Sequence, residues 1–114
     1  MKQLLLILSL ALASCSVMDT SFYDDNESLL AVDVRVAVDK LNCESEASIA
    51  YLKGTIDRIY FYSESKGSKD IYSLLGKMKE TTNGMEYSQS ICNLKKKLLI
   101  KQSADIANAI MRRF

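Results

Sequence analysis

The 114-residue sequence contains no histidine, no tryptophan and no proline. Without histidine the chain cannot build a Ser-His-Asp or Cys-His nucleophile, nor a histidine-ligated zinc site. The chain also lacks a phosphate-binding glycine loop and a calcium-binding acidic loop. Its carboxylate groups, Asp24-Asp25-Glu27 and Glu44-Glu46, are interpreted as surface acids at helix starts rather than as a glycosidase pair. We therefore expect a protein that is not an enzyme and that uses no cofactor and no metal.

Cysteine is scarce, and the first of the three cysteines has an informative setting. A lysine at position 2 precedes a nearly unbroken aliphatic run, Leu4 to Ala13, and small residues follow. This is the pattern of a secretory signal peptide, here residues 1–14. The apolar run is shorter than the ~20 residues that span a bilayer.

The residues at the end of that leader, Leu12-Ala13-Ser14-Cys15, resemble the lipobox of bacterial lipoproteins. The resemblance implies that Cys15 receives diacylglycerol, that the leader is cut before it, and that the new amino group is acylated, for example with palmitate. Two or more acyl chains give stable membrane attachment. In enterobacterial lipoproteins an aspartate directly after the lipidated cysteine retains the protein in the inner membrane. Ser16 occupies that position here, so the resemblance implies the outer membrane, with the protein facing the periplasm. An ordinary signal peptide with a chance cysteine is the alternative.

The remaining cysteines predict a disulfide. An exported bacterial domain meets an oxidising periplasm, so Cys43 and Cys92 are expected to be joined. The alternative is two free thiols acting as metal ligands or redox groups. Residues 15–28 are polar and acidic and are interpreted as the lipidated end and a tether, and residues 29–114 as one domain.

Residues 29–41 give an ambiguous pattern. Valine alternates with other residues from Val32 to Val38, which is typical of a strand, yet Leu30, Val34 and Leu41 also share one helical face. No later segment offers a partner strand, so we predict a helix, capped by Asn26 or Ser28.

Three further helices are predicted from apolar residues at helical spacing. The second is capped by Ser45, and the third covers about 69–81 and ends where Asn83-Gly84 supplies left-handed residues. The fourth begins near Glu86 and either continues or restarts at Ser103, because its later apolar residues follow at a shifted phase. The expected buried stripes are Ile49, Leu52, Ile56 and Ile59; Ile71, Leu74, Leu75 and Met78; and Tyr87, Ile91, Leu94 and Leu98, continued by Ile106 and Ile110. The predicted fold is all-α, a small bundle of four to five helices pinned by one disulfide.

Charge is divided along the chain. Cys15 to Glu64 holds ten acidic and four basic residues, and Ser65 to Phe114 holds four acidic and ten basic residues. Two interpretations stay open: acidic helices lie against basic helices, or the lysines and arginines near the carboxyl end steer an oppositely charged partner. Nucleic acid is a poor candidate for a partner of a lipid-anchored envelope protein.

The predicted second helix carries the candidate partner-binding residues. Three adjacent aromatic residues around Phe61 cannot all face one core, so at least one is expected to be exposed. Exposed aromatic residues and arginine are typical of interface hot spots, and a mid-helix glycine allows close approach. The candidates are Tyr51, Gly54, Arg58, Phe61 and Tyr62.

A cysteine followed by a Tyr-x-x-Gly-x-x-Asp helix, here Cys43 and Tyr51 to Asp57, resembles the helical periplasmic immunity proteins that neutralise amidase effectors of type VI secretion. The later Cys-Pro signals of that group are missing. The size and single disulfide also resemble periplasmic acid-stress chaperones, and the size and anchor resemble phage or plasmid lipoproteins. These resemblances imply a non-catalytic envelope lipoprotein that binds another protein as an inhibitor, immunity or exclusion factor. The alternative is a structural accessory lipoprotein of an envelope assembly.

Overall fold

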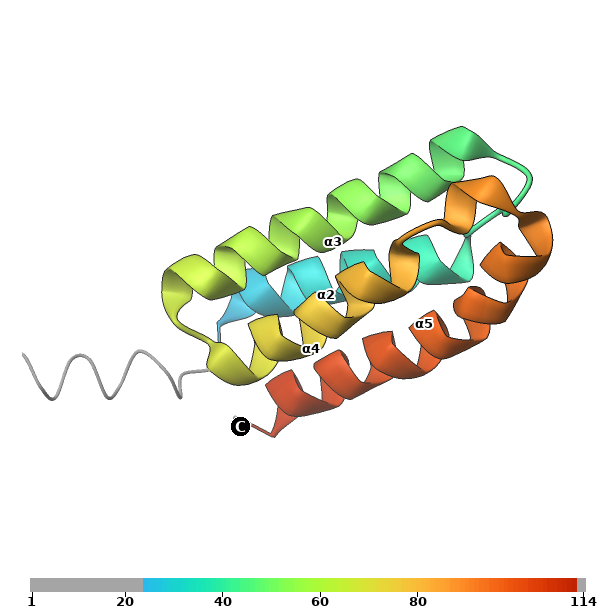
Figure 1. Cartoon of the computed structure of the whole chain (residues 1–114). Coiled ribbons are helices and arrows are strands. Elements are labelled where there is room, and N and C mark those ends of the chain that lie inside the picture. Colours follow the sequence, from blue (N-terminus) through green and yellow to red (C-terminus); the bar gives the residue numbers. More distant parts are fainter. Residues whose placement is uncertain (1–23, 113–114) are drawn as a thin grey trace, which may run out of the picture.

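The computed structural model describes residues 24–112, and this part of the chain is an antiparallel four-helix bundle (Figure 1). The helices are α2 (Asp25–Asp39), α3 (Glu46–Lys66), α4 (Lys69–Thr82) and α5 (Gln89–Met111), and the 3₁₀ turn η1 (Met85–Tyr87) joins the last two. Each helix packs against the next one along the chain, and α5 closes the bundle against α2. The predicted all-α bundle is confirmed. The predictions for residues 1–23, Cys15 among them, lie outside the described residues, as do Arg113 and Phe114.

Helix α2 resolves the ambiguous valine run. Val34 and Val38 are buried in the core, whereas Val32 and Val36 are exposed. The helical period therefore divides the four valines between two faces, because residues four apart share a face and residues two apart do not.

The amino-terminal end of α2 differs from the prediction. Asp24 caps the helix, and its carboxylate accepts hydrogen bonds from the backbone N–H groups of Asn26 and Glu27. The caps predicted at Asn26 and Ser28 are wrong, because Asp24 stands in extended backbone one residue before the first turn and can reach both N–H groups. Helix α2 thus starts within the segment interpreted as a tether.

Helices α3 and α4 follow the sequence pattern closely. Ser45 caps α3 as predicted, and all four residues of its expected stripe are buried. In α4, Leu74 is only partly buried while the rest of its stripe lies in the core. Helix α4 ends with Asn83 in extended backbone, so only Gly84, at φ 80°, is left-handed. The predicted left-handed Asn83 is wrong, because the single glycine is sufficient to turn the chain.

Helix α5 contradicts the first part of the predicted stripe, whereas Ile106 and Ile110 are buried as predicted. It is one continuous helix beginning at Gln89, three residues after the predicted start at Glu86, and without the restart at Ser103. The stripe from Tyr87 to Leu98 faces outward. Its buried residues are Cys92, Leu99, Ser103, Ile106 and Ile110. The aliphatic residues among them lie seven, fourteen and eighteen positions after Cys92. This spacing places them on the same side of the helix as Cys92, and this side faces the core.

The predicted disulfide is present. Cys43, in the turn after α2, is joined to Cys92 in the first turn of α5, with sulfur atoms 2.11 Å apart and Cα atoms 5.7 Å apart. The bond spans 49 positions of sequence. It fixes the start of α5 to the turn between α2 and α3.

Candidate functional site

Four of the five predicted partner-binding residues form one exposed line along α3. Tyr51, Gly54, Arg58 and Phe61 are spaced by three, four and three residues, which places them on the same side of a helix. All four are exposed, Tyr51 by 62% and Phe61 by 63%. We call these four residues the α3 outer line. Large aromatic side chains at this exposure bury little surface within the bundle, so they are available to another molecule.

Tyr62 lies elsewhere. Its hydroxyl donates a hydrogen bond to the carboxylate of Asp24, with 2.6 Å between the oxygen atoms, and the side chain is partly buried between α3 and the start of α2. Placing Tyr62 with the other four candidates is therefore wrong, because one helical step from Phe61 turns it toward α2. Within the bundle it links α3 to the residue that caps α2.

A polar network surrounds Tyr62. Glu27 is fully buried and accepts a hydrogen bond of 2.9 Å from the hydroxyl of Ser63. Lys66 lies 3.5 Å from Glu27 and 3.7 Å from Asp24. Glu27 is therefore not the surface acid that the sequence predicted. A buried carboxylate is tolerated only when it is paired and hydrogen-bonded, and the end of α3 supplies both partners.

This network sets the pKa of Asp24. Partial burial acts to raise the pKa of its carboxyl, but the hydrogen bonds from Tyr62 and from two backbone N–H groups, with the Lys66 charge, hold it below its ordinary value of 3.8. The same contact raises the pKa of Tyr62 above 10.0, first because its O–H donates to Asp24 and then because it is shielded from water. Both shifts favour the carboxylate–phenol pair that closes this end of the bundle.

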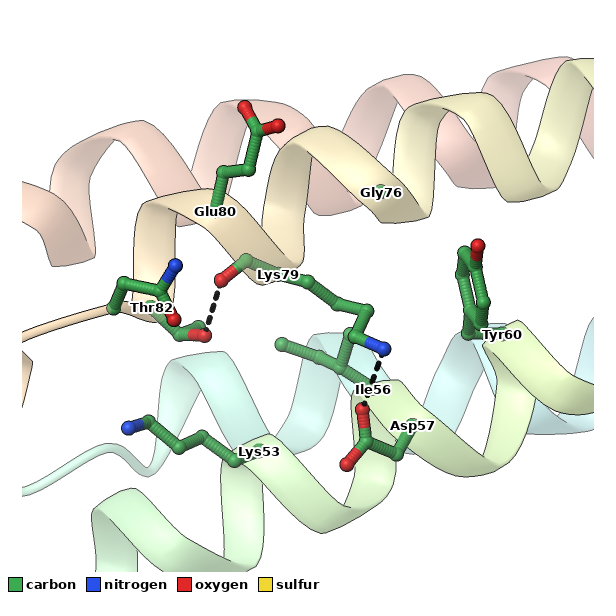
Figure 2. Close-up of a pocket in the computed structure, with 9 residues that line it drawn as sticks. Lys53, Ile56, Asp57, Tyr60, Gly76, Lys79, Glu80 and Thr82 are labelled. Carbon is green, nitrogen blue, oxygen red and sulfur yellow. Dashed lines mark hydrogen bonds and ion pairs between the residues drawn. The ribbon is translucent and has the colours of Figure 1, made fainter.

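An open groove of about 520 Å³ lies between α3 and α4 (Figure 2). Its wall on α3 includes Lys53, Asp57 and Tyr60, each of which directly precedes a residue of the α3 outer line in sequence. An ion pair crosses the groove, with the Lys79 ammonium 3.3 Å from the Asp57 carboxylate. The same ammonium lies 4.3 Å from the centre of the Tyr60 ring, a cation–π contact. At the end of the groove Lys53 pairs with Glu86 at 2.8 Å, which lowers the pKa of Glu86 chiefly through this hydrogen bond.

Two helical glycines border this region and leave space unfilled. Beyond the adjoining residues and backbone of its own helix, no atom lies within 4 Å of the position that a Cβ would take at Gly54 or at Gly76. Glycine in a helix interior costs about 1 kcal/mol relative to alanine. Contacts within the described bundle do not require glycine at either position. Both glycines expose bare helix backbone, one on the outer line and one in the groove wall, to any molecule that approaches.

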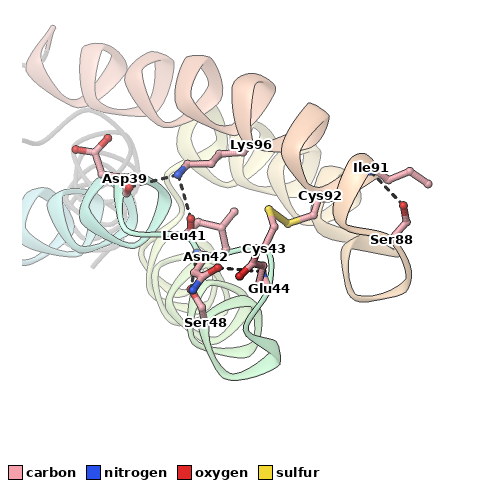
Figure 3. Close-up of a disulfide and its surroundings, with 10 residues drawn as sticks. All are labelled: Asp39, Leu41, Asn42, Cys43, Glu44, Ser48, Ser88, Ile91, Cys92 and Lys96. Atoms are coloured by element: carbon pink, nitrogen blue, oxygen red, sulfur yellow. Dashed lines mark hydrogen bonds between the residues drawn. A yellow bond between two sulfur atoms is a disulfide. The ribbon is translucent and has the colours of Figure 1, made fainter.

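The lysine run of α5 is mostly structural, which the sequence did not reveal. Lys96 donates to the backbone carbonyls of Asp39 at 3.5 Å and Leu41 at 3.0 Å, at the end of α2 (Figure 3). Lys95 donates to the carbonyl of Asn83. These ammonium groups satisfy carbonyls that a helix end leaves without partners. Lys97, Lys101 and Arg112 remain exposed.

Two further findings on the described residues concern metal sites and membrane helices. Among residues 24–112, no three histidine, cysteine, aspartate or glutamate side chains gather at a distance suited to a metal ion. In the same range no helix is long and apolar enough to cross a membrane. Comparisons with known protein families, with curated proteins and with solved structures found no match.

Proposed function

We propose that the chain is a non-catalytic lipoprotein of the bacterial envelope, attached to the membrane through Cys15, whose helical domain binds another protein and inhibits it. The observation that carries this proposal is the α3 outer line, where Tyr51 and Phe61 flank Gly54 and Arg58 in the open. Aromatic residues and arginine are enriched at interfaces, and tyrosine and arginine are among the commonest hot-spot residues.

The groove beside this line supports the same interpretation. Two ion pairs fix charges here, Asp57 with Lys79 across the groove and Lys53 with Glu86 at its end. Such pairs give a partner a fixed pattern of charge to match, which favours specificity. Inhibition would then be steric, with a rigid bundle covering a site on the partner at little cost in ordering.

The anchor is tested separately, by mass spectrometry of the chain recovered from membranes. We expect an amino-terminal cysteine carrying acyl chains, and loss of both acylation and cleavage in Cys15→Ala. An unmodified thiol at Cys15, or cleavage at another position, would contradict the lipoprotein part of the proposal.

The binding role is tested by affinity capture from envelope and competitor extracts with the full chain in detergent. The test variant is Phe61→Ala, and the control is Leu29→Ala, because Leu29 on α2 is exposed to the same 63%. One hydrolase or receptor that the native chain and Leu29→Ala retain, and that Phe61→Ala loses, supports an inhibitor or immunity factor acting through α3. Equal retention by all three chains would remove α3 from the proposal.

A structural accessory subunit of an envelope assembly is the second candidate. The observation that favours it is the outward-facing apolar stripe of α5, because an assembly subunit exposes apolar surface to its neighbours. Capture of a complex of several subunits in place of one protein would support this role.

A further inference from the structure

A narrow apolar seam runs along the start of α5 on the surface of the bundle. It consists of Ile91, Leu94 and Leu98, whose exposed fractions range from 46% to 67%. Their spacing is three and four residues, which puts them on one line of the helix about 10 Å long. This is the spacing at which one helix packs along another in a coiled coil. We call these residues the α5 seam. Tyr87, exposed by 84%, precedes them in η1.

Positive charge surrounds the α5 seam. Lys95 and Lys97 follow Leu94, and Lys101 extends the line by a further turn. Next to Leu98 lies a hollow of about 210 Å³ between α4 and α5, with two lysines, Lys77 and Lys101, and one acidic residue, Asp105, in its walls. No acidic residue occurs between positions 89 and 104.

The acidic residue before the seam does not offset this charge. Glu86 precedes Tyr87, and its carboxylate is paired with Lys53 of α3 at 2.8 Å. The surface that another molecule meets is therefore both apolar and basic.

We propose that the α5 seam docks an amphipathic helix of a partner protein, with apolar residues at the same spacing and aspartate or glutamate on both flanks. Acidic flanks complement the lysines, and flanking charges decide which helices pair in a coiled coil. The proposal is independent of the α3 outer line and holds for either function proposed above.

Two other occupants fit less well. A second copy of the chain would bring lysine flanks against lysine flanks, which is destabilising. An anionic bilayer suits a helix with a broad apolar face, whereas α5 exposes a single line there, because its opposite face is in the core.

The test uses a synthetic helix as the probe. The peptide has three heptads with isoleucine and leucine at the two seam positions and glutamate at the flanking positions, and a control peptide carries lysine at the flanks. Calorimetry with the full chain in a neutral detergent is expected to show binding of the glutamate peptide and none of the lysine peptide. Raising salt from about 50 to about 500 mM should weaken binding several-fold, because the flanking charges are screened.

Matched variants locate the binding. Leu94→Ser with Leu98→Ser is expected to weaken it at least tenfold, whereas Leu29→Ser with Val36→Ser, which changes exposed apolar residues of α2, should leave it unchanged. The proposal is overturned if the glutamate peptide does not bind, or if the two double variants bind equally. It is also overturned if the seam variant instead abolishes self-association of the native chain, or its flotation with phosphatidylglycerol vesicles.

Discussion

At the scale of single residues, Asp24 acts on two helices. Its carboxylate closes the first turn of α2 and accepts the hydroxyl of Tyr62 from the end of α3. Glu27, one turn later, receives Ser63 and Lys66 from the same end of α3. These side-chain contacts join helix ends that are 38 and 36 positions apart in sequence. Sequence patterns could not predict them, because an acidic residue at a helix start is usually exposed.

We expect Tyr62→Phe to lower the free energy of unfolding by about 1–2 kcal/mol, because Asp24 loses a hydrogen bond to its charged form. Urea unfolding at neutral pH measures the change, with Tyr72→Phe on α4 as the control.

The effect of Tyr62→Phe should depend on pH. The pKa of Asp24 is lowered from 3.8 by folding, so its contribution is present above that value and is lost as pH falls through the lower folded pKa. The pKa of Tyr62 is raised from 10.0, so its contribution is present below that value and is lost as pH rises through the folded pKa. Native and variant chains should therefore differ most between these limits and converge as pH falls below 3.8. A difference that stays constant far into the acid range would show that the hydrogen bond is not the cause.

Gly54 tests whether a residue serves the fold or the surface. Gly54→Ala is expected to raise the stability of the bundle by about 0.5–1 kcal/mol, because no neighbouring atom obstructs the added methyl and alanine favours the helix. Gly84→Ala is the opposite control, since Gly84 has a φ of 80° and alanine there is strained by about 1–2 kcal/mol. Thermal unfolding followed by circular dichroism measures both. A stabilised Gly54→Ala chain that captures less partner would assign this glycine to binding.

At the scale of the elements, α2 shows what an alternating pattern can mean. Its four valines divide into a buried pair and an exposed pair. We expect Val34→Ala to cost about 1–3 kcal/mol through the cavity it leaves, and Val32→Ala to change stability by less than about 0.5 kcal/mol. Chemical denaturation of the two variants measures the difference. Equal losses would contradict the helical assignment, because a strand places both side chains on one face.

Helices α3 and α4 were predictable and the face of α5 was not. The stripe from Ile49 to Ile59 is the main apolar set of α3, so periodicity alone assigns its core face. Helix α5 carries two apolar sets, one through Leu94 and one through Leu99, and both have helical spacing. Periodicity cannot choose between them. The predicted disulfide could have decided which set is buried. Because Cys92 shares a side of the helix with Leu99, joining Cys92 to Cys43 turns the set through Leu99 toward the core.

The candidate site was predictable only where it depends on the pattern within one helix. Three adjacent aromatic residues require an exposed one, and Phe61 is exposed as expected. The groove between α3 and α4 depends on how two helices pack, which a pattern within one helix does not contain. Lys79, which pairs with Asp57 across the groove, was therefore missed.

At the scale of the whole molecule, two features connect distant parts of the chain. The first is the division of charge between the two halves of the sequence. Lys79 of the basic half pairs with Asp57 of the acidic half. In the other groove pair the basic residue, Lys53, belongs to the acidic half and the acidic residue, Glu86, to the basic half. Exposed pairs of this kind contribute about 0–1 kcal/mol each. The disulfide stabilises the bundle more than either pair does, because it restricts the unfolded chain as a whole.

Reduction of the Cys43–Cys92 bond is expected to lower the free energy of unfolding by about 2–4 kcal/mol, because the unfolded chain regains the freedom of a long loop. Urea unfolding with and without reductant measures it. Cys15→Ala serves as the background, so that only the paired thiols respond. Identical midpoints in both conditions would mean that the bond adds nothing to the bundle.

The same bond changes how the domain would respond to tension between its two ends. Force entering at Asp24 passes along α2 to Cys43, crosses the sulfur bridge to Cys92 and leaves through α5. The covalent load path bypasses α3 and α4, together with the groove between them. Because the two joined cysteines are 49 positions apart in sequence, the stretched chain is roughly 160 Å shorter than its reduced form. Pulling on the ends would strip α2 and α5 from the bundle while the backbone of α3 bears no tension.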